Sequence, residues 1–260
     1  MTQSERRNYI LSQLALSGKI FVNDIALSTG ASTETIRRDI ASLDEQGILK
    51  KVHGGAEKLS SVFQAAFSVR MQTNIQAKNC IGQAVADLIE DGSSVFIDFG
   101  STSYAFAQSL SKFSALTVIT NSHIIAEAVF RANSNIKIFL LGGIFSGENN
   151  QNIGSHVVNN IMNFKADYAV IGASGVSING GICCAYLEEA EIAKAMLQNA
   201  DKSIVICDNS KIGARAFYKI ANIKDIKHII TNDLNVNILK EYNDLGVNVI
   251  SVNSNYPKES

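Results

Sequence analysis

Seven short apolar runs rich in β-branched residues punctuate the chain from residue 94 onward, and helical patterns separate most of them. The runs span residues 94–98, 116–120, 136–141, 168–171, 203–207, 228–231 and 247–252. Strands of this length that alternate with helices are typical of a parallel sheet with helices on both faces. We therefore predict an α/β domain over residues 78–260, preceded by a linker over residues 59–77.

Small and polar residues gather where these predicted strands end. In open α/β sheets, ligands bind beyond the carboxyl ends of the strands. The segment 100–103 lies between a strand and a helix, where backbone N–H groups and hydroxyls can converge on a phosphate. Such turns are also rich in glycine and serine for steric reasons alone, and Lys211 could equally be a solvated loop lysine. The candidate ligand-binding residues are Asp98, Gly100, Ser101, Thr102, Ser103, Asn121, Gly142, Gly143, Gly172, Ala173, Ser174 and Lys211.

The first 58 residues show a different pattern, with short helical segments separated by glycines. Apolar residues at helical spacing predict a first helix over residues 1–17. Residues 19–22 are long enough only for an edge strand or a connector. Asn23 is expected to cap a second helix over residues 24–29. A supporting helix followed by two short helices around a tight turn predicts a helix-turn-helix unit.

The third helix of this unit indicates what it binds. We expect Ser32 to cap it, Gly47 to close it, and Ile36, Ile40 and Leu43 to face inward. Its early residues then face outward, as a recognition helix in the major groove requires. Arginine binds guanine bidentately, and hydroxyls bind bases or phosphates. The alternative is an ordinary solvated helix surface that binds nothing.

A strand over residues 48–53 that runs into Gly54-Gly55 predicts a hairpin, the wing, with basic residues near its tip. These residues would contact the DNA backbone or the adjacent groove. The predicted N-terminal domain, residues 1–58, is thus a winged helix-turn-helix. Its candidate DNA-binding residues are Ser32, Thr33, Thr35, Arg37, Arg38, Lys50, Lys51 and His53.

The charge of the chain does not itself favour nucleic acid. The formal net charge is −1, and residues 1–58 hold eight Lys and Arg against seven Asp and Glu. Any DNA contact must therefore come from local basic clusters that the fold places. No apolar run approaches the roughly 18 residues of a membrane span, and the amino terminus lacks a signal-peptide apolar block. We expect a cytoplasmic protein.

The cysteines predict no metal site. Cys80, Cys183, Cys184 and Cys207 show no Cys-x-x-Cys spacing, and the four histidines are scattered. Small buried thiols in a reducing cytosol are the simplest interpretation. We expect no metal, no cofactor and no catalytic residues.

Two sets of strings closely resemble the DeoR family of transcriptional regulators. In the first 58 residues they are T-I-R-R-D at 35–39, Leu43, Gly47 and H-G-G-A at 53–56. The second set runs through the predicted α/β domain in order: 96–102, 118–122, 141–143, 171–175, 187–190 and 208–211. The resemblance implies a DNA-binding regulator whose sensor domain is similar to ribose-5-phosphate isomerase and binds phosphorylated sugars or related intermediates. Residues 180–196 look somewhat like the glycerol-3-phosphate regulators of the family.

A rival hypothesis is a sugar-phosphate isomerase with an appended DNA-binding domain. Isomerisation needs a carboxylate base and acid groups at the oxygens. Aligned with the isomerase pattern, the four catalytic positions fall on Ile171, Ser174, Cys184 and Ala193. None of these side chains transfers protons at neutral pH, although Glu188 or Glu189 could supply a displaced base. A scaffold that binds neither DNA nor metabolite does not explain why both sets of motifs occur together.

The combined hypothesis is a repressor of carbohydrate or polyol catabolic genes. A homo-oligomer, dimer or tetramer, would place two recognition helices on repeated half-sites of a double-stranded operator. A phosphorylated sugar or glycerol 3-phosphate would bind the sensor and change the operator affinity. Whether the effector releases or promotes DNA binding is not readable from the sequence.

Overall fold

The computed structural model describes residues 2–45, 49–57 and 67–254, and the chain divides into two units, residues 1–69 and 70–260. The structure differs from the expected linker over 59–77, because helix α4 (Phe67–Gln72) and the first residues of α5 (Ile75–Leu88) are helical. The Lys78 ammonium holds the corner between these two helices by donating to the backbone carbonyls of Arg70 and Thr73. Residues 59–66 of the expected linker lie outside the described part.

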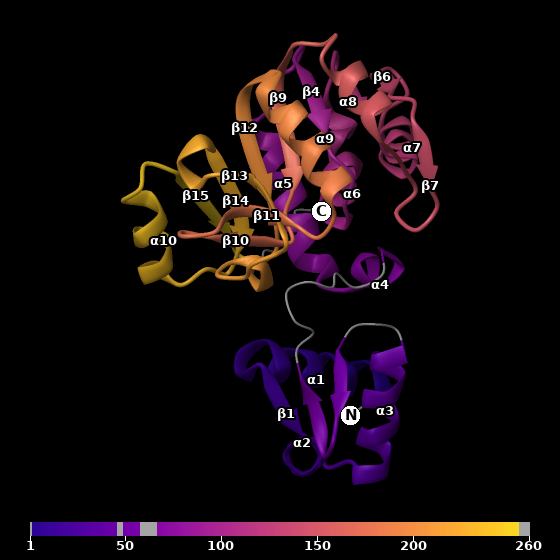
Figure 1. Ribbon diagram of the computed structural model, residues 1–260, viewed down its shortest axis with the longest axis vertical. Helices are drawn as coiled ribbons and strands as arrows, with labels where there is room; N and C mark the ends of the chain where they lie inside the picture. Colours follow the sequence, from indigo (N-terminus) through magenta and orange to yellow (C-terminus); the bar gives the residue numbers. More distant parts are fainter. Residues whose placement is uncertain (1, 46–48, 58–66, 255–260) are drawn as a thin grey trace. The chain divides into compact units, whose positions relative to one another are not determined.

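The first unit is a helix-turn-helix with a small antiparallel sheet (Figure 1). Its elements are α1 (Gln3–Ser17), β1 (Lys19–Phe21), α2 (Val22–Thr29), α3 (Thr33–Glu45), β2 (Lys50–Val52) and β3 (Gly55–Glu57). The sheet has the order β1-β3-β2, so residues 19–21 form an edge strand, as expected. Ile10, Leu14, Ile25, Ile36 and Ile40 are among the buried side chains that pack the three helices together.

The expected cap of the second helix is wrong. Helix α2 begins two residues earlier than expected, at Val22, and no side chain caps it. The backbone N–H of Val22 instead donates to the carbonyl of Gly54 in the wing turn, at 2.9 Å. Because this contact satisfies an N–H at the helix start, the chain enters α2 directly from β1, and Asn23 remains exposed. Gly47, the expected end of α3, lies outside the described residues.

The second unit is built on a seven-stranded parallel sheet of order β15-β14-β12-β9-β4-β5-β6. The strands are β4 (Ser94–Ile97), β5 (Thr117–Thr120), β6 (Lys137–Leu140), β9 (Ala166–Gly172), β12 (Ala200–Ile206), β14 (His228–Asn232) and β15 (Asn248–Val252). Each coincides with one of the seven predicted apolar runs. The parallel α/β fold is therefore confirmed.

Helices cover both faces of this sheet (Figure 1). They are α5, α6 (Ser101–Gln108), α7 (His123–Ala132), α8 (Ser155–Ile161), α9 (Leu187–Gln198) and α10 (Val236–Asn243), with 3₁₀ turns at Leu110–Lys112, Asn209–Lys211 and Ile223–Asp225. Val95 and Ile97 of β4 pack with α5, α6 and α7, whereas Phe96 packs with α8 and α9 on the opposite face. This alternation follows from the two-residue period of a strand.

Five shorter strands were not expected. Antiparallel β7 (Ile144–Ser146) and β8 (Gln151–Ile153) form a hairpin, and a three-stranded sheet joins β10 (Gly175–Ser177), β11 (Gly181–Cys184) and β13 (Tyr218–Ala221). Three or four residues interrupted by glycine and asparagine carry too little period-two pattern to predict a strand. Tertiary contacts decide them: an added Cβ at Gly181, for instance, would lie 2.2 Å from the carbonyl oxygen of Ala221.

Candidate DNA-binding and effector sites

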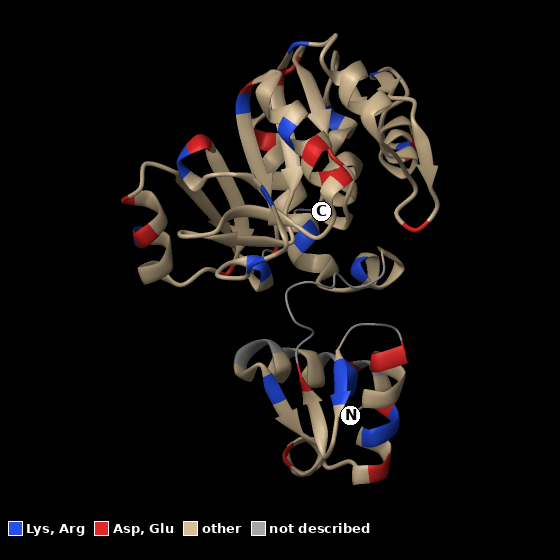
Figure 2. Ribbon diagram, viewed as in Figure 1, with Lys and Arg blue, Asp and Glu red and all other residues tan. Residues whose placement is uncertain are grey.

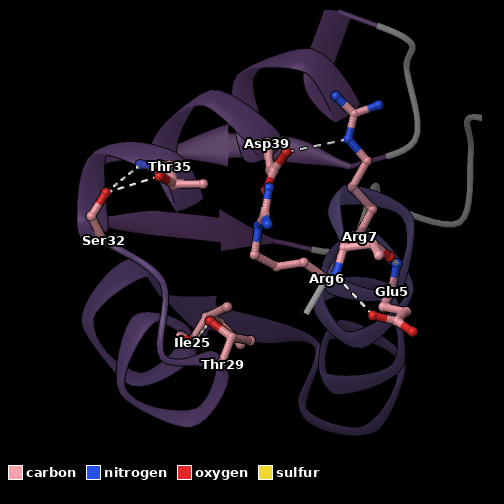
Figure 3. A network of polar contacts seen from close by, with 9 residues as sticks. Glu5, Arg6, Arg7, Ile25, Thr29, Ser32, Thr35 and Asp39 are labelled. Atoms are coloured by element: carbon pink, nitrogen blue, oxygen red, sulfur yellow. Dashed lines mark hydrogen bonds and ion pairs between the residues drawn. The ribbon is translucent and has the colours of Figure 1, made fainter.

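Helix α3 has the geometry expected of a recognition helix. The Ser32 hydroxyl accepts a hydrogen bond from the N–H of Thr35 at 3.2 Å and lies 2.9 Å from its hydroxyl, so Ser32 caps the helix as expected (Figure 3). Ile36 and Ile40 are buried. The side chains of Arg37 and Arg38 are 60% and 81% exposed, and each lies near Glu34 without a close ion pair, at 3.8 and 3.6 Å. Both guanidinium groups are therefore accessible to a partner.

The wing adds basic residues to the same unit (Figure 2). Strands β2 and β3 pair around a turn at His53-Gly54, and Lys50, Lys51 and His53 are all exposed. Only His53 lies at the tip: Lys50 pairs with Glu57 at the open end of the hairpin. The expectation that all three residues lie near the tip therefore needs correction, because the hairpin is only three residues long on each strand and Lys50 is its first residue.

Asp39 is a structural residue of this unit that the sequence reasoning did not identify. Its carboxylate is 2% exposed and accepts from Nε of Arg6 at 2.5 Å and from Nε of Arg7 at 3.4 Å (Figure 3). The two arginines belong to α1, so these ion pairs join α1 to α3. A charged residue within the apolar stripe of Ile36 and Ile40 was the signal that could have revealed it.

The second site lies where β4 and β9 end, next to each other in the sheet. The chain leaves β4 toward β5 on one side and leaves β9 toward β12 on the other, which makes this the topological switch point where α/β proteins bind ligands. An added Cβ at Gly172 would lie 3.6 Å from the carbonyl oxygen of Phe99 and 4.0 Å from Oγ of Ser103. The structure thus brings together the expected strand-end segments 98–103 and 172–174.

The start of α6 carries polar groups at this switch point. Gly100, with φ of 146°, precedes the helix, and Ser101, Thr102 and Ser103 are at most 9% exposed. The first N–H groups of a helix have no acceptor within it and carry partial positive charge. The Ser103 hydroxyl is buried and has no hydrogen-bond partner among the described residues. This arrangement suits an anion.

Asp98 lies at the amino-terminal end of the segment 98–103. It is buried, and its Oδ1 accepts from the N–H of Phe99 at 2.8 Å. Burial, with the nearby Glu189 carboxyl, raises the pKa of Asp98 well above its usual range. The carboxyl therefore holds its proton more readily, which reduces repulsion toward an anion at α6.

Four side chains that the sequence reasoning did not select for the effector site form one hydrogen-bonded group, in contact with Asn121 and next to Phe99. Glu189 of α9 is 4% exposed, and its Oε1 accepts from Nδ2 of Asn149 at 3.0 Å and from Nε2 of Gln151 at 3.2 Å. Arg70 donates to Oδ1 of Asn149 at 3.0 Å, and its guanidinium lies 5.7 Å from the centre of the Phe99 ring. They come from α4, from the segment between β7 and β8, from β8 and from α9, so no single sequence window shows them together.

Burial also shifts the ionisation of these groups. It raises the pKa of Glu189 to about 7, against the opposing effect of Arg70. It lowers the pKa of Lys78 to about 8, while the nearby Asp208 acts in the opposite direction. Groups whose pKa values are strongly shifted are typical of binding sites.

The other expected residues differ in how they relate to this cluster. Asn121 is buried and donates to Oε1 of Gln151 at 3.1 Å. Lys211 lies in the 3₁₀ turn after β12 and acts electrostatically on Lys78. Gly142 and Gly143 are exposed and follow the edge strand β6, where an added Cβ at Gly143 would contact β8. A need for close packing accounts for that glycine.

The isomerase catalytic positions hold no proton-transfer groups. Ile171 and Ala193 are buried in the apolar core. Cys184 donates from its thiol to the carbonyl of Tyr186 at 3.2 Å, and burial raises its pKa to about 12. Over the described residues, no group of three His, Cys, Asp or Glu side chains could hold a metal ion, and no helix is long and apolar enough to span a membrane.

Comparison with known proteins assigns both units. The DeoR-like helix-turn-helix domain matches residues 6–62, and the DeoR C terminal sensor domain matches residues 73–233. The HTH-type transcriptional repressor CsqR of Escherichia coli (strain K12) is 32% identical over 90% of this chain and 89% of its own length. The HTH-type transcriptional repressor GlcR of Bacillus subtilis (strain 168) is 36% identical over 90% of each chain.

One further relative is named for the regulon that it represses, and one solved structure is similar at a lower identity. The glycerol-3-phosphate regulon repressor of Haemophilus influenzae is 30% identical over 93% of this chain and 95% of its own. Ribose 5-phosphate isomerase A of Methanocaldococcus jannaschii aligns with a TM-score of 0.40 and 18% identity over 54% of this chain and 55% of its own, too distant to carry an argument. The two domain matches and the full-length relatives agree with the geometry of both units: the chain belongs to the DeoR family and is a DNA-binding transcriptional regulator with a sensor domain, not an enzyme.

Proposed function

We propose that this regulator represses carbohydrate or polyol catabolic genes and that a phosphorylated sugar or polyol, binding at the start of α6, changes its operator affinity. The observation that carries the proposal is the buried, unpartnered Ser103 hydroxyl beside the first N–H groups of α6 at the switch point. Phosphate oxygens are acceptors for such donors. The names of the relatives, one of them a glycerol-3-phosphate regulon repressor, support the same class of effector.

DNA binding is assigned to α3 and the wing. Arg37 and Arg38 are exposed on α3, with Ser32, Thr33 and Thr35 at its start and Lys50, Lys51 and His53 on the wing. A single unit offers one recognition helix, and operators with two half-sites need two. We therefore also propose a homo-oligomer, a dimer or tetramer.

A thermal-shift screen tests the effector class. The panel comprises glycerol 3-phosphate, several hexose phosphates, their unphosphorylated counterparts and inorganic phosphate. A ligand at a hundredfold excess over its Kd stabilises the folded state by about 2.7 kcal/mol, which gives a clear shift. Shifts that require the phosphate support the proposal, whereas shifts from the free sugars alone contradict it.

Replacing Arg37 with alanine is expected to weaken operator binding about 10- to 100-fold. Removing one base or phosphate contact costs roughly 1–3 kcal/mol of binding free energy. Loss of a phosphate contact also reduces the slope of log affinity against log salt concentration by about one. Fluorescence anisotropy with a duplex selected by the wild-type protein from a randomised pool measures both effects. Arg131→Ala is the matched control, because this 77% exposed arginine of α7 lies in the other unit. Equal losses in both variants would rule out a specific role for Arg37.

Replacing Ser103 with alanine is expected to weaken effector binding about tenfold or more without unfolding the protein. A hydrogen bond to a charged group is worth roughly 1.5–3 kcal/mol, and the hydroxyl has no protein partner to lose. Isothermal titration with the best phosphate ester of the screen measures the loss. Ser109→Ala, at the opposite end of α6, is the control. Operator binding without effector should stay at the wild-type level. An unchanged effector affinity in Ser103→Ala would contradict an anion site at the start of α6.

A further inference from the structure

The sensor unit buries hydrogen-bonding groups that none of the described residues satisfies. Among the described residues, four buried side-chain oxygens lack a partner: Ser103 Oγ, Asn121 Oδ1, Glu189 Oε2 and Thr231 Oγ1. Buried polar atoms are nearly always hydrogen-bonded, because an unmet group costs free energy. Two of the four, Asn121 Oδ1 and Glu189 Oε2, belong to residues that both bond to Gln151. Such a concentration points to a ligand.

Asn121 and Glu189 are linked through Gln151. Nδ2 of Asn121 donates to Oε1 of Gln151 at 3.1 Å, and Nε2 of Gln151 donates to Oε1 of Glu189 at 3.2 Å. Nδ2 of Asn121 also donates to the carbonyl of Asn152 at 2.9 Å, and Nδ2 of Asn149 donates to the same Glu189 oxygen at 3.0 Å. The amide donors are thus engaged within the protein. The two free atoms, Asn121 Oδ1 and Glu189 Oε2, are acceptors, and their complement is a group that donates.

This acceptor cluster adjoins the anion-binding start of α6. Arg70 links neighbours of both: it donates to Asn149, which bonds Glu189, and its guanidinium lies 5.7 Å from the centre of the Phe99 ring, just before α6. Asp98, which precedes Phe99, lies close enough to Glu189 for their carboxyls to affect each other electrostatically. One ligand can therefore have an anionic end at α6 and a donor-bearing end at Glu189.

We propose that Glu189, Gln151 and Asn121 form the hydroxyl-recognising end of the effector site, and that the effector is a phosphate ester whose carbon chain carries free hydroxyls and no carboxylate. The proposal rests on the proposed phosphate site at α6. Hydroxyl groups donate to the two free acceptor oxygens. Above the pKa of Glu189, which is about 7, its carboxyl is ionised, so a carboxylate in the same place would offer no donor and would face a like charge. The site then discriminates by both hydrogen bonding and charge.

Isothermal titration of the full-length protein tests this assignment with matched ligands. The probes are glycerol 3-phosphate and glucose 6-phosphate, their carboxylate counterparts 3-phosphoglycerate and 6-phosphogluconate, the unphosphorylated polyols, and inorganic phosphate. We expect at least one hydroxylated ester to bind at least tenfold more tightly than its carboxylate counterpart. This comparison uses the wild-type protein and does not depend on the folding of any variant.

Glu189→Gln puts an amide N–H donor in place of the free acceptor oxygen Oε2. We expect it to weaken binding of the hydroxylated ester at least tenfold, to narrow the gap to the carboxylate counterpart, and to leave inorganic phosphate unaffected. Glu188→Gln is the matched control, because Glu188 is an exposed neighbour in the same first turn of α9.

The outcomes separate this inference from the proposed function. Wild-type affinity of Glu189→Gln for the hydroxylated ester, or equal binding of the carboxylate counterpart by the wild type, would overturn the hydroxyl assignment and leave the phosphate site intact. Binding of unphosphorylated polyols as tightly as their esters would overturn the phosphate site. Absence of binding by every probe would overturn both.

Discussion

Replacing Asp39 with alanine is expected to destabilise the DNA-binding unit by about 3 kcal/mol and to weaken operator binding. The substitution leaves Arg6 and Arg7, whose side chains are 12% and 26% exposed, without their shared carboxylate. Removing one partner of a buried ion pair typically costs about 3–5 kcal/mol, since the other charge stays in a poorly solvated place. The lower end applies here because Arg7 reaches solvent. A domain of this size has only about 5 kcal/mol to lose.

Urea unfolding of the full-length protein, monitored by hydrogen exchange of the α1 and α3 amides, measures this loss of stability. Glu34→Ala is the matched control, because Glu34 lies on the same helix, is 62% exposed and makes only long contacts with Arg37 and Arg38. Exposed pairs contribute about 0–1 kcal/mol, so the control should unfold near the wild-type midpoint. Equal midpoints for Asp39→Ala and Glu34→Ala would contradict a structural role for the ion pairs between α1 and α3.

The second large effect is expected at Glu189, where glutamine should stabilise the effector-free sensor unit at pH 8. Burial raises the pKa of Glu189 to about 7 in the folded protein, from an ordinary value of 4.5. Between these values the folded state retains a proton that the unfolded state loses, so stability falls as the pH rises through this window. Above pH 7 the cost is complete. At 1.36 kcal/mol per unit of pKa it amounts to about 3 kcal/mol, which the neutral glutamine avoids.

Thermal unfolding of the wild type and of Glu189→Gln from pH 4 to pH 8 measures this difference. The charged groups around Glu189 are Arg70, Asp98 and Glu188, and Arg70 alone favours the ionised form. We expect the variant's advantage to be largest at pH 8 and to disappear near pH 4.5. Glu188→Gln should show no such trend. An advantage that does not change with pH would contradict burial as its cause.

A carboxyl group that lowers the stability of its own fold needs another reason to be there. Together, increased stability and weakened effector binding in Glu189→Gln would assign this residue to recognition. Stability and function are commonly in conflict at binding sites.

Much of the fold was predictable because its signals are local. Each of the seven sheet strands contains a short apolar run, and the inner strands β4, β5 and β14 are buried on both faces. Such runs are recognisable without knowledge of their neighbours. The Ser32 cap and the apolar stripe of α3 are likewise set by residues within one or two helical turns. The start of α2 was wrong, since the contact that replaces a side-chain cap comes from Gly54 in the distant wing turn.

The proposed effector site was likewise predictable only in its local part. The start of α6 was predictable because strand, glycine and hydroxyl residues follow one another in the chain, and parallel strands bring their carboxyl ends to one edge. Glu189 and Gln151 were not selected, because a polar residue in a helix or hairpin is normally solvated. Only their enclosure by other elements makes their unmet hydrogen bonds costly.

The sequence by itself determined the two-part organisation, the parallel sheet, the cap and apolar stripe of α3 and the glycine- and hydroxyl-rich turn before α6, since each depends on periodicity or on neighbouring residues. The tertiary structure alone decided that Asp39 joins α1 to α3 and that Arg70, Asn149, Gln151 and Glu189 meet at the switch point. The physical reason is that burial changes what a polar side chain does. A carboxylate that would be an ordinary solvated group in the unfolded chain becomes, once enclosed, either an ion-pair partner or an unmet acceptor that a ligand can satisfy.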